Sequence, residues 1–152
     1  MTNKKQIVVA VSGGMDPIHI GHVRLFQEAK KLGDKLVVIL NNDNWLRKKK
    51  NHILMHQKER KEIIESIREV DRVIITGHLR NPKDMSVSKE ILSIRPDIFA
   101  NGGDRKEEND ILETEVCHRV GCKLVFNVGH GGKIQSSSWL LAKYVNKVKP
   151  VR

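Results

Sequence analysis

The chain is organised around the stretch Ser12-Gly13-Gly14-Met15-Asp16-Pro17-Ile18-His19-Ile20-Gly21-His22. An apolar run at 7–11 precedes this stretch, and a helical pattern at 23–32 follows it. The apolar run predicts a buried parallel strand, because such strands carry nearly continuous aliphatic residues. Residues 12–22 are therefore expected at the carboxyl end of a strand, which is where open α/β sheets bind their ligands.

The residue types in this stretch favour a ligand that carries phosphate. Gly13 and Gly14 allow backbone N–H groups to approach an anion, and the next helix directs the positive end of its dipole to the same place. His19 and His22 add two imidazole donors, and Gly21 between them has no side chain to obstruct a ligand. A single histidine in a turn is often only structural, but this pair at a strand-to-helix junction favours a functional role.

The rest of the chain alternates aliphatic runs with amphipathic patterns. The further predicted strands are 35–40, 73–75, 98–100 and 123–128. Helical faces are indicated at 23–32, 63–70, 87–94, 112–120 and 140–145. This order predicts an α/β fold with a Rossmann-like, five-stranded parallel sheet and helices on both faces. We find no linker, repeat or low-complexity tract, so residues 1–152 are expected to form a single domain.

The segments between these elements carry local signals of their own. Residues 41–44 predict a turn, and 45–56 a basic loop or short helix above the site. Ser86 is expected to cap the helix at 87–94. Gly121 is expected to end the helix at 112–120.

Composition limits the possible classes of protein. The 28 Lys and Arg residues against 18 Asp and Glu give a net charge of +10, which attracts polyanions such as nucleotides, sugar phosphates or nucleic acid. Aromatic residues make up 4% of the chain, which is few for a platform that stacks single-stranded bases. No apolar run approaches a membrane span, and residues 1–6 lack the core of a signal peptide. We expect a soluble, cytoplasmic protein in which Cys117 and Cys122 are ordinary small apolar residues without a disulfide.

The four residues from His19 to His22 resemble the HxGH signature of the cytidylyltransferase-like nucleotidyltransferases. In that family the two histidines bind the triphosphate of CTP or ATP while a phosphorylated substrate attacks the α-phosphorus. Further landmarks of the family occur in order over roughly residues 7–145. They are Gly33-Asp34, Asn42-Asp43, Glu59-Arg60, Val70-Asp71, Pro96-Asp97, Gly102-Gly103-Asp104 and Ser136-Ser137-Ser138.

The resemblance implies specific site residues. Catalytic roles are implied for His19, His22 and Lys49. Nucleotide binding is implied for Gly14, Met15, Asp16, His19, Gly21, His22, Gly102, Gly103, Asp104, Ser136, Ser137 and Ser138. Contact with the substrate phosphate is implied for Lys49 and Arg60. Counting from Asp43 places one family lysine on Lys49 and the second on Asn51, which leaves Lys48 or Lys50 to substitute.

The resemblance also implies an activity. The chain is expected to transfer AMP or CMP from ATP or CTP to a small phosphorylated substrate (a sugar, heptose or polyol phosphate), with Mg²⁺ and with release of pyrophosphate. ATP is favoured, because Gly102-Gly103-Asp104 after Pro96-Asp97 resembles the heptose-1-phosphate adenylyltransferases. The arginine that glycerol-3-phosphate cytidylyltransferases place before their hydroxyl run is absent from 130–133. No metal site made of protein ligands is predicted, and a homodimer is possible by analogy with the family.

Two alternatives remain at this stage. His-Ile-Gly-His is also a signature of class I aminoacyl-tRNA synthetases, although 152 residues leave no room for tRNA and amino-acid modules. A basic nucleic-acid-binding protein that kept the fold without catalysis would bind in a salt-sensitive way and show no turnover. The intact pair His19 and His22 argues against that second alternative.

Overall fold

A computed structural model describes residues 4–147, except 104, 106, 109–110 and 130–134. Its elements are β1 (Val8–Gly13), α1 (Ile20–Lys30), β2 (Lys35–Leu40), α2 (Asp43–Lys50), α3 (Gln57–Glu65), β3 (Arg72–Ile75), α4 (Ser88–Ile94), β4 (Ile98–Ala100), α5 (Thr114–Val120), β5 (Lys123–Val125) and α6 (Ser137–Lys147). The strands form one sheet in the order β3-β2-β1-β4-β5, and every pairing is parallel. The predicted Rossmann-like sheet is confirmed.

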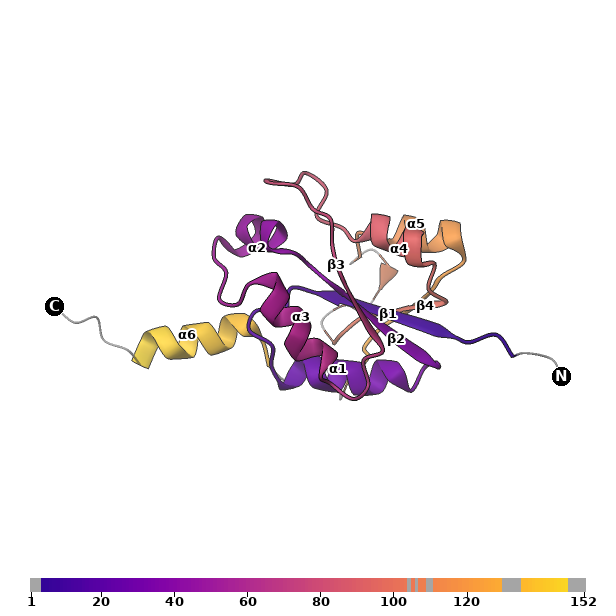
Figure 1. Cartoon of the computed structure of the whole chain (residues 1–152), viewed down its shortest axis with the longest axis horizontal. Helices are drawn as coiled ribbons and strands as arrows, with labels where there is room; N and C mark the ends of the chain where they lie inside the picture. The colour runs from indigo at the N-terminus through magenta and orange to yellow at the C-terminus, as the bar shows by residue number, and fades with distance from the viewer. Residues whose placement is uncertain (1–3, 104, 106, 109–110, 130–134, 148–152) are drawn as a thin grey trace.

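Helices cover both faces of this sheet (Figure 1). Alternate residues of β1 point to opposite faces, as the strand period requires. Val9 and Val11 pack with Phe26 of α1 and Ile64 of α3 in one buried cluster. The opposite cluster contains Ala10 of β1, Ile39 of β2, Phe99 of β4, Ile91 of α4 and Val116 and Cys117 of α5. β1 is therefore buried on both faces, which explains its continuous apolar sequence.

The strand register brings the carboxyl ends of three strands to one level. Gly13 pairs with Leu40, and Leu40 pairs with Ile75. The ladder continues one residue further, since Asn41 N–H donates to Gly13 O at 2.9 Å and Thr76 N–H donates to Leu40 O at 2.9 Å. The loops that leave β1, β2 and β3 therefore start side by side, as the position of the glycine and histidine stretch predicted.

Two helices differ from the sequence-based expectation. α1 begins at Ile20 rather than 23, because His19 is its N-cap. α2 starts at Asp43, inside the turn predicted for 41–44. Asn42 is the N-cap of α2, and its side-chain oxygen accepts a hydrogen bond from Trp45 N–H at 3.0 Å. Asparagine suits both turns and N-caps, so the residue type alone did not separate the two possibilities.

Smaller differences concern the ends of other elements. β5 stops at Val125 instead of residue 128, and α3 ends at Glu65, after which Ile67 and Val70 still pack against the core. The N-cap of α4 is Val87, and not Ser86 as had been predicted. The hydroxyl oxygen of Ser86 accepts a hydrogen bond from Ser88 N–H at 3.3 Å. The predicted end of α5 at Gly121 is confirmed, with φ +71°.

Cys117 and Cys122 are buried free thiols at the end of α5. Cys122 N–H donates to Cys117 O at 2.8 Å around the left-handed Gly121. This is a Schellman motif, which brings the side chains before and after the glycine together. The Cys122 thiol and burial raise the pKa of the Cys117 thiol. The pair serves as small core residues, as expected, although their contact was not foreseen from their spacing.

Among the described residues, every helix is too short or too polar to cross a membrane.

Candidate functional site

The two signature histidines hold each other in place at the start of α1. His19 Nδ1 accepts a hydrogen bond from Gly21 N–H at 3.0 Å, and His22 Nδ1 accepts one from His19 N–H at 3.1 Å. Because a backbone N–H can only donate, the neutral form of each ring carries its proton on Nε2. The two ring centroids lie 3.8 Å apart with the planes tilted by 31°. The turn therefore holds two stacked imidazoles in one defined tautomer.

The His22 ring stays uncharged near neutral pH. Burial lowers the pKa of His22 from 6.5 to about 3, and the charges of His19 and Lys50 act in the same direction. A neutral imidazole with its proton on Nε2 is a hydrogen-bond donor that does not lose its proton at physiological pH. His22 is thus suited to donate to a phosphate oxygen without acting as a base.

The His19 ring requires a glycine at residue 21. A Cβ atom at residue 21 would lie 2.8 Å from His19 Cε1 and 2.9 Å from its Nδ1. The third neighbour of that position is the backbone oxygen of Gln135, at 3.6 Å. The missing side chain therefore makes room for the imidazole that caps α1, and access for a ligand, the reason predicted from the sequence, stays a prediction.

Gly14 is likewise explained by packing inside the protein. A Cβ atom at Gly14 would lie 2.9 Å from Leu46 Cδ2 and 3.1 Å from Trp45 Cζ3. A Cβ at Gly13 would lie 3.2 Å from Met15 Cε. The close approach of α2 and of Met15 to the end of β1 therefore leaves no room for a side chain at these positions, and the contact of this backbone with an anion stays a prediction.

The side chains of Met15 and Asp16 face the protein. Met15 belongs to the core cluster and is 2% exposed. Asp16 is fully buried, and its carboxylate accepts hydrogen bonds from Leu54 N–H at 2.7 Å and Met55 N–H at 2.8 Å. Asp16 therefore ties the histidine turn to the loop between α2 and α3. Its side chain supports the site instead of offering oxygens to a nucleotide.

Arg60 also has a structural role at the site. Its guanidinium donates to Gly14 O and Asn41 O at 2.7 Å each, to Met55 O at 2.9 Å and to Asp43 Oδ1 at 2.8 Å. The residue is only 1% exposed. The predicted contact of Arg60 with a substrate phosphate does not fit this placement, because the guanidinium is buried and joins the ends of β1 and β2 to α2.

Asp43 completes this support. Burial acts to raise the pKa of its carboxyl, but hydrogen bonds from Arg60 and His56 outweigh burial and hold that pKa below its ordinary value. Asp43 N–H also donates to Gln57 Oε1 at 2.9 Å, which joins the start of α2 to the start of α3.

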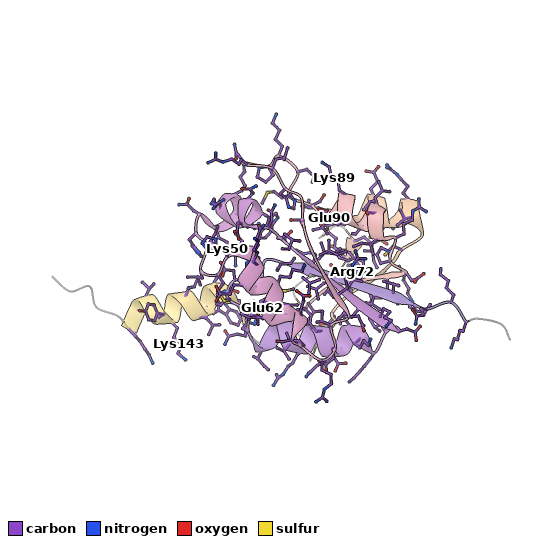
Figure 2. All side chains as sticks on the ribbon, viewed as in Figure 1. Lys50, Glu62, Arg72, Lys89, Glu90 and Lys143 are labelled. Carbon is purple, nitrogen blue, oxygen red and sulfur yellow. The ribbon has the colours of Figure 1, made fainter. Side chains whose placement is uncertain are left out.

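The three lysines of α2 point to different surroundings. Lys48 donates to Asn81 Oδ1 at 2.8 Å, and Lys49 is exposed. Lys50 is half-buried at the end of α2, on the side of α3 (Figure 2). Burial lowers the pKa of Lys50, with Arg60 and Lys49 acting in the same direction and Asp16 opposing them. The charge of Lys50 also acts on the pKa of His22, whereas counting along the sequence had favoured Lys49 for the phosphate contact.

The serine run enters the site through the start of α6. Ser136 caps this helix, because its hydroxyl oxygen accepts from Trp139 N–H at 3.0 Å. The Ser137 hydroxyl donates to Pro17 O at 2.8 Å, and Ser138 is exposed. The structure thus brings the predicted serines next to the histidine turn from the far end of the chain, while α6 projects outward from that point (Figure 1).

The end of β4 supplies a more open part of the same edge. Asn101 is buried, and its N–H donates to Val125 O at 2.8 Å. A Cβ at Gly102 would meet nothing within 4 Å, so this glycine borders open space. Gly103 follows it in a turn, half-buried, and the predicted Asp104 lies outside the described residues.

Sequence reasoning passed over Asn41, the first residue after β2. Asn41 is 4% exposed, and its Oδ1 is a buried acceptor without a partner among the described atoms. Such an acceptor destabilises a fold unless a bound molecule or water donates to it. A polar residue directly after an aliphatic strand was the signal that could have marked it.

A cluster of three or more His, Cys, Asp or Glu side chains able to hold a metal ion does not occur in the part of the chain that the structure describes.

Comparison with known proteins gives a consistent result. The sequence model of the family described as Cytidylyltransferase-like matches residues 10–119. An FAD synthase of Aciduliprofundum boonei is 36% identical over 116 residues, which cover 76% of this chain and 73% of the relative. An FAD synthase of Pyrococcus abyssi is 35% identical over 125 residues, covering 82% and 80%. The crystal structure of the lipopolysaccharide core biosynthesis protein from Thermoplasma volcanium superposes with a TM-score of 0.68 at 29% identity, covering 83% of this chain and 99% of that one.

Proposed function

This chain belongs to the cytidylyltransferase-like family of nucleotidyltransferases, and from that membership we propose that it transfers the adenylyl group of ATP to the phosphate of FMN. In FAD, the phosphate of FMN is joined to the phosphate of AMP by a phosphoanhydride bond, so an FAD synthase makes the kind of bond that the sequence predicts. Relatives of that name match most of the chain, which supports both ATP and FMN.

The observation that carries this proposal is the pair of stacked histidines, and Lys50 is the cation whose charge acts on His22. The two Nε2–H donors and the ammonium group lie at the carboxyl edge of the sheet, where they can bind successive phosphates of ATP. Aligned donors that act on charge developing in the transition state are a main source of catalysis in phosphoryl-group transfer.

The proposed reaction needs no nucleophile from the protein. An anionic oxygen of the acceptor phosphate forms a bond to the α-phosphorus of ATP, while the bond from that phosphorus to the α–β bridging oxygen breaks. The electron pair of the broken bond leaves with pyrophosphate. His19, His22 and Lys50 stabilise the negative charge on the reacting phosphate and on the leaving pyrophosphate, and Mg²⁺ supplies further charge neutralisation. A neutral His22 fits this role, since no proton has to be removed.

Nucleotide contacts are proposed around the same turn. The start of α6, with Ser136 to Ser138, adjoins the histidines and offers a second helix N-terminus to phosphate. Gly102 and Gly103 border the open end of β4, where a base and ribose have room, and Asp104 remains part of this proposal.

A sugar or polyol phosphate is the second candidate acceptor. The solved structure described as a lipopolysaccharide core biosynthesis protein supports it, because this chain covers almost all of that structure. The catalytic groups are the same for both acceptors, since both present a phosphate oxygen to the α-phosphorus.

Release of pyrophosphate decides among these candidates. Purified protein with Mg²⁺ would be given ATP or CTP together with FMN, heptose 1-phosphate or glycerol 3-phosphate, and the products would be identified by mass. We expect FAD from ATP and FMN, and no pyrophosphate when the acceptor is omitted. If turnover occurs with a sugar or polyol phosphate and not with FMN, that phosphate is the acceptor. Consumption of ATP at the same rate without any acceptor would contradict group transfer altogether.

A further inference from the structure

Helix α2 is basic on two sides, and only one of them faces the histidines. The charge of Lys50 acts on His22, as described above. Asn44, Arg47 and Lys48 follow one another at positions i, i+3 and i+4, so they share one face of the helix. That face is turned to the loop of residues 76–86 between β3 and α4, which runs next to α2 at the top of the view in Figure 1.

Four hydrogen bonds donated by the side chains of residues 42–48 hold this loop against α2. The side-chain amides of Asn42 and Asn44 both donate to His78 O, at 2.8 and 2.9 Å. Trp45 Nε1–H donates to Met85 O at 2.9 Å, and Lys48 Nζ donates to Asn81 Oδ1 at 2.8 Å. The position of the loop relative to the helix is therefore set by side chains of α2.

The docked loop and the helix line a cavity of about 270 Å³ that is open to solvent. Its lining consists of Asn44, Arg47, Lys48, Arg80 and Asn81. Three of these five side chains are cations, two are carboxamides, and none is a carboxylate. The loop thus brings Arg80 next to two cations that are distant from it in sequence.

The carboxylates on the neighbouring elements are engaged elsewhere. Asp43 pairs with Arg60 and His56. Asp84 accepts from Ser86 N–H at 2.9 Å, and Glu90 of α4 accepts from Gly77 N–H at 3.2 Å (Figure 2 labels Glu90). Among the described residues, no ion pair involves Arg47, Lys48 or Arg80. Three like charges around one cavity repel each other unless an anion lies between them.

We propose that this cavity is a second anion site that binds a phosphate-type oxyanion, separate from the histidine pair. The guanidinium group of arginine is planar, and its N–H donors match the spacing of phosphate oxygens. Arg47 would bind the anion from the helix and Arg80 from the loop. The Lys48 ammonium and the amides of Asn44 and Asn81 supply further donors. Inorganic phosphate and pyrophosphate share this chemistry, and the second is released by the proposed reaction.

The test is a titration with each of these anions, followed by NMR on the backbone amides of Asn44 and Asn81. The sample is the full chain in chloride buffer without nucleotide. We expect saturable shifts of both amides, and the anion that saturates at the lower concentration identifies the preferred ligand. In the double variant Arg47→Gln/Arg80→Gln the affinity should fall about tenfold or more, since two charge-assisted contacts are lost.

Two controls make this result specific. Lys58→Gln/Arg68→Gln removes the same charge from exposed positions and should leave the affinity within about twofold. His22→Ala should leave the shifts of Asn44 and Asn81 unchanged. Equal weakening in the control pair would overturn the proposal, as would loss of binding in His22→Ala. Binding of single-stranded RNA through the same arginines without any response to phosphate or pyrophosphate would also overturn it.

This titration contains neither ATP nor an acceptor. Its outcome is therefore independent of whether FMN proves to be the substrate, and failure of one proposal does not imply failure of the other.

Discussion

His22 Nδ1 accepts a hydrogen bond of 3.1 Å from the backbone N–H of His19, so the second signature histidine is also part of the cap of α1. Each ring uses its Nδ1 atom for this local structure. Chemistry is left to Nε2, which carries the proton in the neutral form. The same contacts that build the helix start therefore define the tautomer that the site requires.

Replacing His22 by alanine should lower kcat by about a hundredfold or more, because a donor aimed at charge in the transition state is worth on the order of 3 kcal/mol. The binding of ATP should suffer less. From the structure we also expect His22→Ala to lower the free energy of unfolding by about 1 kcal/mol, since the variant removes a capping contact.

His22→Asn separates the two roles of this residue. The asparagine amide oxygen can replace Nδ1 as the capping acceptor, but the side chain is too short to replace Nε2. We expect a melting temperature near that of the wild type together with the same loss of kcat as in His22→Ala. A variant with normal turnover per folded molecule would assign His22 to structure alone.

The depressed pKa of His22 predicts how stability depends on pH. The ordinary value is 6.5, and the folded value is about 3. Between these values the unfolded chain binds the proton and the folded chain does not, so the contribution of His22 is present above 6.5 and is lost as pH falls toward 3. Urea unfolding of the wild type and His22→Asn should show a difference in pH dependence in this range. Parallel curves would contradict the depressed pKa.

Lys50→Ala and Lys49→Ala test which of these two lysines of α2 contacts phosphate. Counting along the sequence favours Lys49, whereas the half-buried position of Lys50 near His22 favours Lys50. We expect Lys50→Ala to lower kcat/KM for ATP about tenfold or more, because a charge-assisted contact to phosphate is lost, and Lys49→Ala to change it much less. Both exchanges remove one charge from the same helix, so each serves as the control for the other. The reverse result would assign the phosphate contact to Lys49, as counting from Asp43 predicted.

Arg60→Met should destabilise the protein by about 3–5 kcal/mol. The exchange removes four hydrogen bonds and leaves Asp43 without its buried partner. Arg68→Gln, at an exposed position, should change stability by no more than about 0.5 kcal/mol. Denaturant unfolding of both variants measures this difference. A nearly neutral Arg60→Met with a raised KM for the acceptor would instead support the phosphate contact first predicted for Arg60.

The family resemblance predicts a homodimer. Light scattering should then report a particle of about twice 17.4 kDa at concentrations used for crystallisation. A mass of one chain in both dilute and concentrated samples would contradict this expectation.

The sequence by itself determined the sheet and the edge on which the site lies. Strands β2 and β4 have the predicted bounds, because each is a short aliphatic run between residues that favour turns or helix ends. The histidine turn could be placed because it directly follows such a run. Local pattern was sufficient here, since strand formation and helix starts depend on neighbours within a few positions.

The direction of the long side chains was decided only by the tertiary structure. Arg60 and Lys50 are both cations close to the site in sequence, yet Arg60 is fully enclosed by the protein, whereas Lys50 is only half-buried and its charge acts on His22. Gly14 and Gly21 make room for Trp45 and His19, and only the folded chain shows which neighbour needs that space. These roles depend on contacts between segments that are far apart in the sequence, where burial and the available hydrogen-bond partners, rather than residue type, determine what a side chain does.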